Sequence, residues 1–532
     1  MYPYLKAFEK LQNEPTLQEV IDTLDNNPKR LNKILDSEFI NPLTKHIDIS
    51  GKNLENICGL SAVMPNIESL NVNNNSLSHL TGAPSGIEKL YCAFNKLNNN
   101  SIYDKFVNLR ILDISNNNIS DLSCLYSLVH LRELTADNNL ITCIPKLYFL
   151  LRLSLMNNNI EDLEFEKMPY LDFLELSGNK IKALIGIEVL TSLRTLCVSN
   201  NQISEVKIVE EMPLLKNLYL SKNSITSFDD INLNLDVLDL SFNELQGEAL
   251  HIKSNLQELC ISNQKHASKN MLLKFNFRDI DFGKYKDCSS ISLSGNVFRN
   301  IKPLFGFFKL EILNLSNCHI RALPDNLSHG LPNIKVLNVA HNSLTDISPL
   351  KKLKRLRILI LLDNELKKVS DVINNLKDLK KLKNLDLSHN IFNAKYYPAF
   401  LDFDDFKLNS SHKCKSQLKN KWEILNENFL KQINDITYVK RLCYRSALIT
   451  ELPRLEFLDS ISICQIERDL AKTHYIKLKN RIETLTSSRE QLNPDYTLES
   501  IRLGSTNNNK LQQVNHNYII NHYLNYFALI NC

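Results

Sequence analysis

Apolar residues return at fixed positions along most of the chain, in the frame L-x-x-L-x-L-x-x-N-x-L. Clear copies are IESLNVNNNSL at 67–77, LRILDISNNNI at 109–119 and LDFLELSGNKI at 171–181. In the first half of the chain, successive asparagines of the frame lie 19 to 22 residues apart. They are Asn75, Asn95, Asn117, Asn139, Asn158, Asn179, Asn201, Asn223 and Asn243, followed later by Asn296, Asn342, Asn364 and Asn390; Gln264 and Cys318 replace the asparagine in two further copies.

Each copy of the frame predicts one short strand and one turn. Alternate side chains of a strand point to opposite faces, so the leucines enter a core and the residues between them face outward. The asparagine turns the chain out of the strand, where its amide satisfies backbone groups. One copy cannot bury its apolar face alone, so neighbours must stack. The pattern resembles the leucine-rich repeat. It predicts an α/β solenoid with a curved parallel sheet of about 16 repeats.

The segments around the repeats predict caps at both ends. Residues 1–45 carry apolar residues at helical spacing and are expected to form a helical N-terminal cap to the solenoid at 46–393. An α-helical C-terminal capping region is expected at 394–462, a charged helix at 463–504 and a flexible tail at 505–532. Two longer gaps, after Gln264 and after Asn364, predict surface bulges or loops on a binding face.

Composition excludes several classes of protein. The 532 residues include 63 Lys and Arg against 59 Asp and Glu, and the net charge of +4 gives no support to nucleic-acid binding. The 12 cysteines are scattered and form no C-x-x-C pair, which removes the usual support for zinc or redox sites. The N-terminus has no apolar signal core, and no stretch reaches the roughly 18 residues of a membrane span. We expect an intracellular, soluble protein with no membrane partner.

Catalytic signatures are absent from the sequence. The chain has no phosphate-binding glycine loop, no H-E-x-x-H, no G-x-S-x-G and no kinase motif. His412 and Cys414 lie close together, but two ligands without partners do not make a metal site. We expect no enzymatic activity, no cofactor, no metal and no catalytic residue.

The outward strand positions are the expected protein-binding residues of the concave face. Their first part is mildly acidic, and its two tyrosines are candidate aromatic anchors. Near the end of the repeats, three apolar side chains face outward together, which predicts either an exposed interaction cluster or a surface covered by another segment. These candidates are Tyr91, Asp113, Glu133, Asp137, Glu175, Tyr219, Asp239, Ile358, Ile360 and Leu362.

Residues 351–383 form a basic stretch. They contain 11 Lys and Arg against four Asp and Glu. Two interpretations remain open, a solvated face or a surface for an acidic or phosphorylated protein segment.

The region after the last repeat carries a more specific resemblance. LDLSHNIFNAKYYPAF, then WEILNENF, then ITYVKRLCYRSALITELPRLEFLDSISI, is similar to the C-terminal region of fungal spindle-pole-body scaffolds of the septation initiation and mitotic exit networks, which are related in architecture to animal centriolin. The matching elements are a tyrosine–proline turn at Tyr397–Pro398, a helix with Trp422, a Y-R-x-x-L helix at Tyr444–Leu448 and a closure at Leu455–Asp459.

The resemblance implies a non-enzymatic scaffold in the cytoplasm and cytoskeleton, at the spindle pole body. It would bind a spindle-pole-body anchor and assemble small-GTPase regulators and kinases for mitotic exit and septation. Long disordered N-terminal regions precede the repeats in this family, whereas this chain begins almost at its first repeat, as expected of a truncated gene model or a reduced homologue. The repeats alone also resemble a regulatory subunit of type-1 protein phosphatase that would bind through its concave face.

Overall fold

A computed structural model describes the chain as two compact units, which divide between Asn255 and Leu256. The described residues are 44–101, 103–208, 211–230, 233–245, 250–252, 255–264, 285–296, 306–398, 425–426 and 428–473. We call those up to 255 unit 1 and those from 256 unit 2. Most of the expected N-terminal cap, most of the insertion after Gln264, Trp422 and the expected tail lie outside the described residues.

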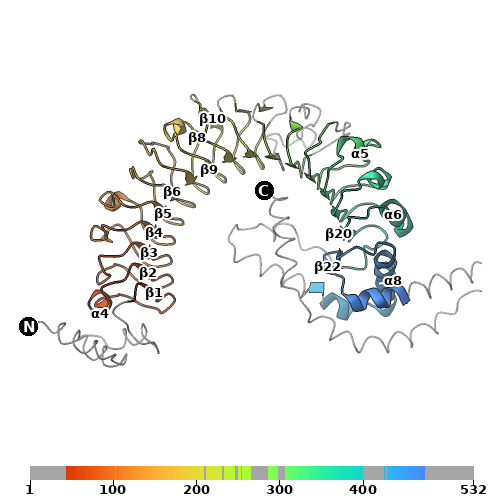
Figure 1. Cartoon of the computed structure of the whole chain (residues 1–532), viewed down its shortest axis with the longest axis horizontal. Coiled ribbons are helices and arrows are strands. Elements are labelled where there is room, and N and C mark those ends of the chain that lie inside the picture. Colours follow the sequence, from red (N-terminus) through yellow and green to blue (C-terminus); the bar gives the residue numbers. More distant parts are fainter. Residues whose placement is uncertain are drawn as a thin grey trace, which may run out of the picture. The chain divides into compact units, whose positions relative to one another are not determined.

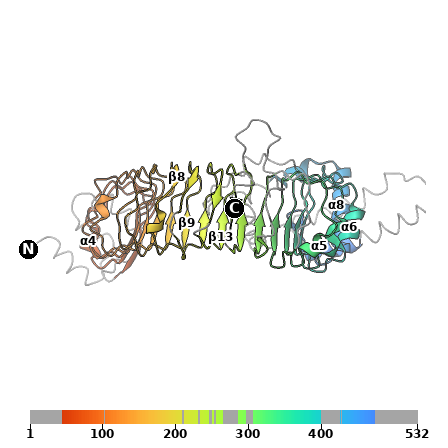
Figure 2. The ribbon, with the colours of Figure 1, turned by 90° about the horizontal axis from the view of Figure 1, so that it is seen from above.

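Unit 1 is a stack of short parallel strands, each supplied by one copy of the frame (Figure 1; Figure 2). They are β1 (His46–Asp48), β2 (Ser69–Asn71), β3 (Lys89–Tyr91), β4 (Ile111–Asp113), β5 (Glu133–Thr135), β6 (Arg152–Ser154), β7 (Phe173–Glu175), β9 (Thr195–Cys197), β11 (Asn217–Tyr219) and β13 (Val237–Asp239). The leucines of neighbouring copies pair in register, as Leu90 does with Leu112.

The return segments of unit 1 hold shorter elements. Two-residue strands pair in parallel, β8 (Ala183–Leu184) with β10 (Glu205–Val206) and β12 (Phe228–Asp229) with β14 (Leu250–His251). Helix α4 (Leu60–Val63) and the 3-10 helices η1 (Ser123–Leu125) and η2 (Ile187–Val189) occupy other turns.

Unit 2 continues the same pattern and then closes it. Its parallel strands are β15 (Glu258–Cys260), β16 (Ser290–Ser292), β17 (Ile312–Asn314), β18 (Val336–Asn338), β19 (Ile358–Ile360), β20 (Asn384–Asp386) and β21 (Phe457–Leu458), and β22 (Ile461–Ser462) pairs antiparallel with β21. Helices α5 (Leu327–Gly330), α6 (Val369–Leu376) and η7 (Ser348–Lys352) lie on the side of the turns away from the strands (Figure 1). Helix α8 (Asp435–Glu451) lies beside α6. The predicted leucine-rich-repeat solenoid is confirmed.

The core of each unit is the row of frame leucines and isoleucines. From β2 to β13 the central strand residue of each turn, such as Leu112 or Leu174, is at most 1% exposed. Burying such a side chain contributes about 1.5–3 kcal/mol, and it is possible only because the next turn covers it.

The frame asparagines connect each turn to the one before it. Asn117 shows the arrangement: its Nδ2 donates to the carbonyl oxygens of Ile114 (2.9 Å) and of Cys92 in the preceding turn (3.0 Å). Its Oδ1 accepts from the backbone N–H of Leu97, also in the preceding turn, at 2.9 Å. One buried amide therefore satisfies backbone groups of two turns at once. Cys318 keeps part of this pattern, since its thiol lies 3.3 Å from the Leu293 carbonyl oxygen.

The residue before the frame asparagine adopts a left-handed backbone in most turns. Asn116, Asn138, Asn157 and Asn200 all have φ of 55°. Asparagine tolerates this conformation better than most residues, which explains the repeated Asn-Asn pairs. Gly178 holds the position with φ 77°, and a Cβ there would lie 2.0 Å from Asn157 Oδ1.

The last turn is closed by a buried carboxylate. In the regular turns the N–H after the strand donates to a carbonyl of the next strand, as Ile114 does to Thr135. Asp459 follows β21 with φ 52°, and its Oδ1 accepts from the N–H of Leu387 at 2.8 Å in place of a carbonyl. Its Oδ2 accepts from the hydroxyls of Tyr397 and of Tyr444, the latter at 2.8 Å.

Buried arginines complete this closure. The Arg445 guanidinium donates to the Leu458 carbonyl oxygen at 2.9 Å and pairs with Glu467 at 2.7 Å. Arg441 donates to the Tyr396 carbonyl oxygen at 3.0 Å. The tyrosine, arginine and aspartate positions of the family resemblance thus form one buried network that seals the end of unit 2.

The hydrogen bonds of the frame asparagines predict a large loss of stability for Asn117→Ala. The substitution leaves buried backbone groups of two turns without partners, so we expect it to lower the free energy of unfolding by about 2–4 kcal/mol. Urea unfolding measures the loss. Asn118→Ala is the matched control, because Asn118 is exposed, and it should cost within about 0.5 kcal/mol. Equal losses of stability in the two variants would contradict the role of the Asn117 amide in connecting the turns.

Asp459 predicts a pH dependence for the closure. Burial first, and then the nearby charge of Asp386, raise the pKa of Asp459 to about 6. A raised carboxyl pKa means that the folded protein holds the proton more tightly than the unfolded chain. The contribution of protonated Asp459 to the free energy of unfolding is therefore full below a pH of about 4. It is lost as the pH rises through about 6.

Between those pH values we expect the wild type to lose about 2 kcal/mol of stability relative to Asp459→Asn, which has no carboxyl group to titrate at this position. Urea unfolding of both proteins at a series of pH values measures it. Parallel pH profiles would show that Asp459 does not titrate in this way.

Candidate functional site

The residues that face away from the core of unit 1 form one continuous row across neighbouring strands. From β3 to β13 the row reads Tyr91, Asp113, Thr135, Ser154, Glu175, Cys197, Tyr219 and Asp239, each directly opposite the next. We call this row the strand face of unit 1. Successive members are spaced by about 4.8 Å, the separation of paired strands. The predicted register of these candidates is therefore confirmed, with Tyr91 and Tyr219 near opposite ends.

The acidic members also have a local structural role. Oδ1 of Asp113 accepts from the Ser115 N–H (3.0 Å), and Oε1 of Glu175 accepts from the Ser177 N–H (2.7 Å). These bonds satisfy backbone donors where the chain leaves the strand, as in an Asx turn. Asn71 makes the same bond to the Asn73 N–H at 3.0 Å. The carboxylates therefore help to cap the turns, and an amide of the same shape does this without a charge.

Glu133 and Asp137 flank the row. Glu133 is half-buried at the start of β5, opposite Arg152. Asp137 lies just beyond β5, where its Oδ1 accepts from the Ser154 hydroxyl (2.6 Å) and from the Met156 N–H (2.8 Å). The carboxylate of Asp137 is therefore engaged in hydrogen bonds that connect two turns.

Burial changes the acidity of this surface. Desolvation raises the pKa of Glu175 and of Asp137, each also affected by a neighbouring carboxylate. Desolvation likewise raises the pKa of the Cys197 thiol, which lies between Glu175 and Tyr219. The partly desolvated carboxylates of this face are a favourable surface for a cationic group from another protein.

Two predicted surface residues are buried. Asp239 is 4% exposed and Ile360 is 2% exposed. Ile360 does point away from the core, opposite Asn338 and Asp386, while Leu359 and Leu361 are fully buried on the other side. Of the two alternatives left open for this apolar cluster, exposure is therefore wrong at Ile360. Ile358 and Leu362 are half-buried. Strand alternation fixes only the direction of a side chain, and neighbours on both adjacent strands leave Ile360 little access to solvent.

The basic side chains of the stretch at 351–383 are exposed in unit 2. Lys351, Lys352, Lys354 and Arg355 lie in and after η7, and Lys383, just before β20, pairs with Glu456 at 2.6 Å. Whether this surface is simply solvated or binds an acidic segment stays a prediction.

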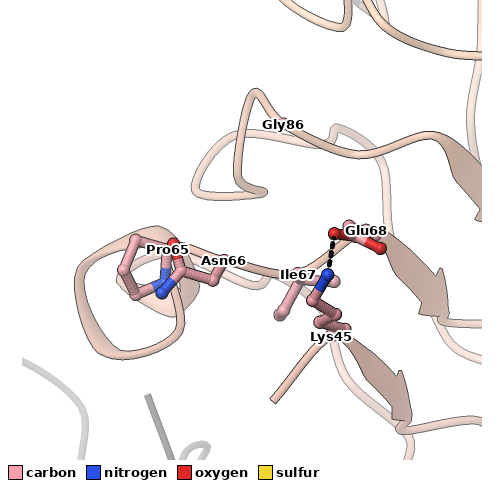
Figure 3. Close-up of a pocket in the computed structure, with 6 residues that line it drawn as sticks. All are labelled: Lys45, Pro65, Asn66, Ile67, Glu68 and Gly86. Carbon is pink, nitrogen blue, oxygen red and sulfur yellow. Dashed lines mark hydrogen bonds and ion pairs between the residues drawn. The ribbon is translucent and has the colours of Figure 1, made fainter. Parts of the chain in front are cut away.

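An open depression of about 390 Å³ lies at the first turns of unit 1 (Figure 3). Pro65, Asn66 and Gly86 are among its lining residues, and the exposed pair Lys45–Glu68 at 2.7 Å crosses it. An exposed ion pair of this kind contributes little and offers no reactive group.

Neither a metal-binding cluster nor a membrane-spanning helix is found in the described part of the chain. Among those residues no three histidine, cysteine or acidic side chains gather as a metal would require. None of the described helices has the length and apolar character needed to cross a bilayer.

The sequence frame overlooked an aromatic surface before β6 and β7. Tyr148, Phe149 and Tyr170 are 40–51% exposed and contact one another. They stand one or two residues before the first frame leucine, at positions that the frame leaves unspecified. The signal was present as Tyr-Phe and Pro-Tyr directly before the first frame leucine.

Family models match parts of the repeats. The model described as "Leucine rich repeat" covers residues 308–366, and "Leucine Rich repeats (2 copies)" covers 107–148 and 191–233. Among solved structures, a leucine-rich-repeat protein of Leptospira interrogans superposes with a TM-score of 0.53 at 23% identity, over 66% of this chain and 91% of that one. This likeness shows the fold.

Two curated relatives are fungal proteins. The septation initiation network scaffold protein cdc11 of Schizosaccharomyces pombe is 30% identical over 461 residues, which are 81% of this chain and 42% of cdc11. Protein NUD1 of Saccharomyces cerevisiae is 25% identical over 37% of this chain and 22% of NUD1. The chain thus spans less than half the length of either relative.

The burial of Ile360 predicts that Ile360→Asp destabilises unit 2. A carboxylate placed there would be buried beside Asp386, and we expect a loss of about 2–4 kcal/mol in the free energy of unfolding. Ile358→Asp, two residues earlier at a half-buried position, is the control and should cost clearly less. Urea unfolding of both variants decides the matter. If the Ile360→Asp protein is as stable as the wild type, the side chain of residue 360 must be exposed to solvent.

Proposed function

We propose that this chain, which belongs to the leucine-rich-repeat scaffold family of the fungal spindle pole body, is a non-enzymatic scaffold of septation initiation signalling. The observation that carries the proposal is the 30% identity to a septation initiation network scaffold across 81% of the chain. In this role the chain would localise to the spindle pole body and bring together regulators of a small GTPase and protein kinases.

The strand face of unit 1 is the surface that we assign to partner binding. Its side chains are fixed in register by parallel strands, so a partner would lose little free energy in ordering them. Tyr91 and Tyr219 supply aromatic contacts, and Asp113 and Glu175 supply charge. The partner segment that fits this chemistry is extended and carries lysine or arginine.

Localisation tests the cellular role. A fluorescent fusion of the full chain, expressed from its own locus, is expected at the spindle poles during mitosis. A diffuse signal throughout the cell cycle would contradict the proposal. Copurification of a type-1 phosphatase catalytic subunit that is lost in Tyr91→Ala/Tyr219→Ala would favour the phosphatase alternative instead.

A charge-removing pair of substitutions tests the strand face. Asp113→Asn/Glu175→Gln keeps the oxygen acceptors for Ser115 and Ser177 but removes two charges. We expect stability within about 0.5 kcal/mol of the wild type and loss of spindle-pole fluorescence in the fusion. Asp162→Asn/Glu164→Gln removes two exposed charges away from the strands and is the control. Normal localisation of the Asp113→Asn/Glu175→Gln protein would exclude this charged face as the anchor site.

A further inference from the structure

A second surface of unit 1 lies along the residues that immediately precede the strands. One residue per turn occupies this pre-strand row, and each N–H donates to the carbonyl of the row member before it. The row reads Lys45, Glu68, Glu88, Arg110, Arg132, Leu151, Asp172, Arg194, Lys216 and Asp236. Because its members are spaced as closely as the strands, opposite charges in adjacent turns are near enough to form ion pairs.

Ion pairs recur along the row but are interrupted at its centre. Lys45 pairs with Glu68 at 2.7 Å, and Asp172 pairs with Arg194 at 3.2 Å. Arg110 pairs with Glu88 at 3.7 Å. In the turn after Arg132, the pre-strand position is occupied by Leu151. An acidic residue at that position would form an ion pair with Arg132. Among the described residues, Arg132 has no carboxylate within ion-pair distance.

Aromatic side chains surround this interruption. The ring of Tyr148 lies 5.0 Å from that of Phe149 and 6.0 Å from that of Tyr170. Tyr148 and Tyr170 are 50% and 51% exposed, and Leu151 is 41% exposed. Val129, 52% exposed, extends the same surface in the preceding turn. A contiguous apolar patch of this kind marks an interaction site more often than scattered single residues do.

The Arg132 guanidinium is held in position over the patch. It lies 5.4 Å from the centre of the Phe149 ring, and its Nη1 donates to the carbonyl oxygens of Val129 (3.0 Å) and Leu131 (3.1 Å). Its remaining donors have no partner among the described residues. A positioned, partly desolvated guanidinium is a strong site for a carboxylate or a phosphate.

Arg152 adds a second positive charge. Its guanidinium lies 4.2 Å from the centre of the Phe173 ring, without a carboxylate at ion-pair distance among the described residues. Glu133 lies directly opposite Arg152 on β5, and both residues face the same way as the strand face. Arg152 therefore adds a positive charge at the start of β6, one residue after Leu151 of the patch.

We infer that Tyr148, Phe149, Leu151 and Tyr170, together with Arg132, form a docking site for a linear segment of a partner protein that combines apolar and acidic residues. The apolar side chains of the segment would pack on the aromatic cluster, and a carboxylate would bind Arg132. Tyrosine and arginine at the centre of a surface are typical binding hot spots. This site is distinct from the strand face, so it stands independently of the proposed function.

Selection from a phage-displayed library of random short peptides on the purified full chain tests the inference. Peptides recovered on the wild type should be enriched in Asp and Glu next to aliphatic or aromatic residues. Synthetic copies of these peptides should bind Tyr148→Ala/Tyr170→Ala and Arg132→Ala at least about tenfold more weakly. Arg132→Lys should lose part of the affinity, because an ammonium keeps the charge but not the planar fork.

Controls separate binding from folding. All three residues are at the surface, so circular dichroism and the urea midpoint should match the wild type. Phe308→Ala removes another exposed aromatic, 65% exposed, in unit 2 and should change affinity by less than about twofold. Basic peptides, the absence of any selected peptide, or peptides that bind the variants as tightly as the wild type would overturn the inference. A wild-type dimer that Tyr148→Ala/Tyr170→Ala dissolves would also overturn it, because a second copy would then be the occupant.

Discussion

The buried asparagine amide between successive turns is the interaction on which the rest of the structure depends. Each turn ends its strand after about three residues, which leaves backbone donors and acceptors inside the molecule without sheet partners. The amide of Asn117 supplies a donor and an acceptor at that point and connects two turns. Because every turn needs the same pair of groups, asparagine recurs at one spacing. Cys318 shows the tolerance of the position, since a thiol can still donate.

The same requirement explains how the repeats end. At β20 the next strand no longer offers a carbonyl to Leu387, and the side chain of Asp459 takes its place. A carboxylate buried for this purpose needs further donors, which Tyr397 and Tyr444 supply. The short family motifs after the last repeat are therefore parts of one chemical solution, although they are separated by about 60 residues in sequence. This is the physical reason why they occur together.

Periodicity predicted the fold because each frame position has a fixed direction and a fixed neighbour. It placed Tyr91, Asp113 and Glu175 in one row, and it also placed Ile360 correctly in register. It failed on the exposure of Ile360 and Asp239, because burial depends on what packs around a side chain and not only on its direction. It could not reveal that Asp113 caps a turn, which requires the distance to the Ser115 N–H. The exposed aromatic surface of Tyr148 and Tyr170 was not predicted, because the frame leaves their positions unspecified.

A repeat that is fixed on its inner side is free to vary on its outer side, and the departures from average then carry the functional information. On the strand face the cap requires only an oxygen acceptor, so asparagine would serve at Asp113 as it does at Asn71. The negative charge is therefore additional to the structural need. In the pre-strand row the structural need is met by the backbone alone, and Leu151 interrupts charge pairs that adjacent turns retain. Both departures lie on unit 1, so the two surfaces that we propose for binding are neighbours with opposite chemistry.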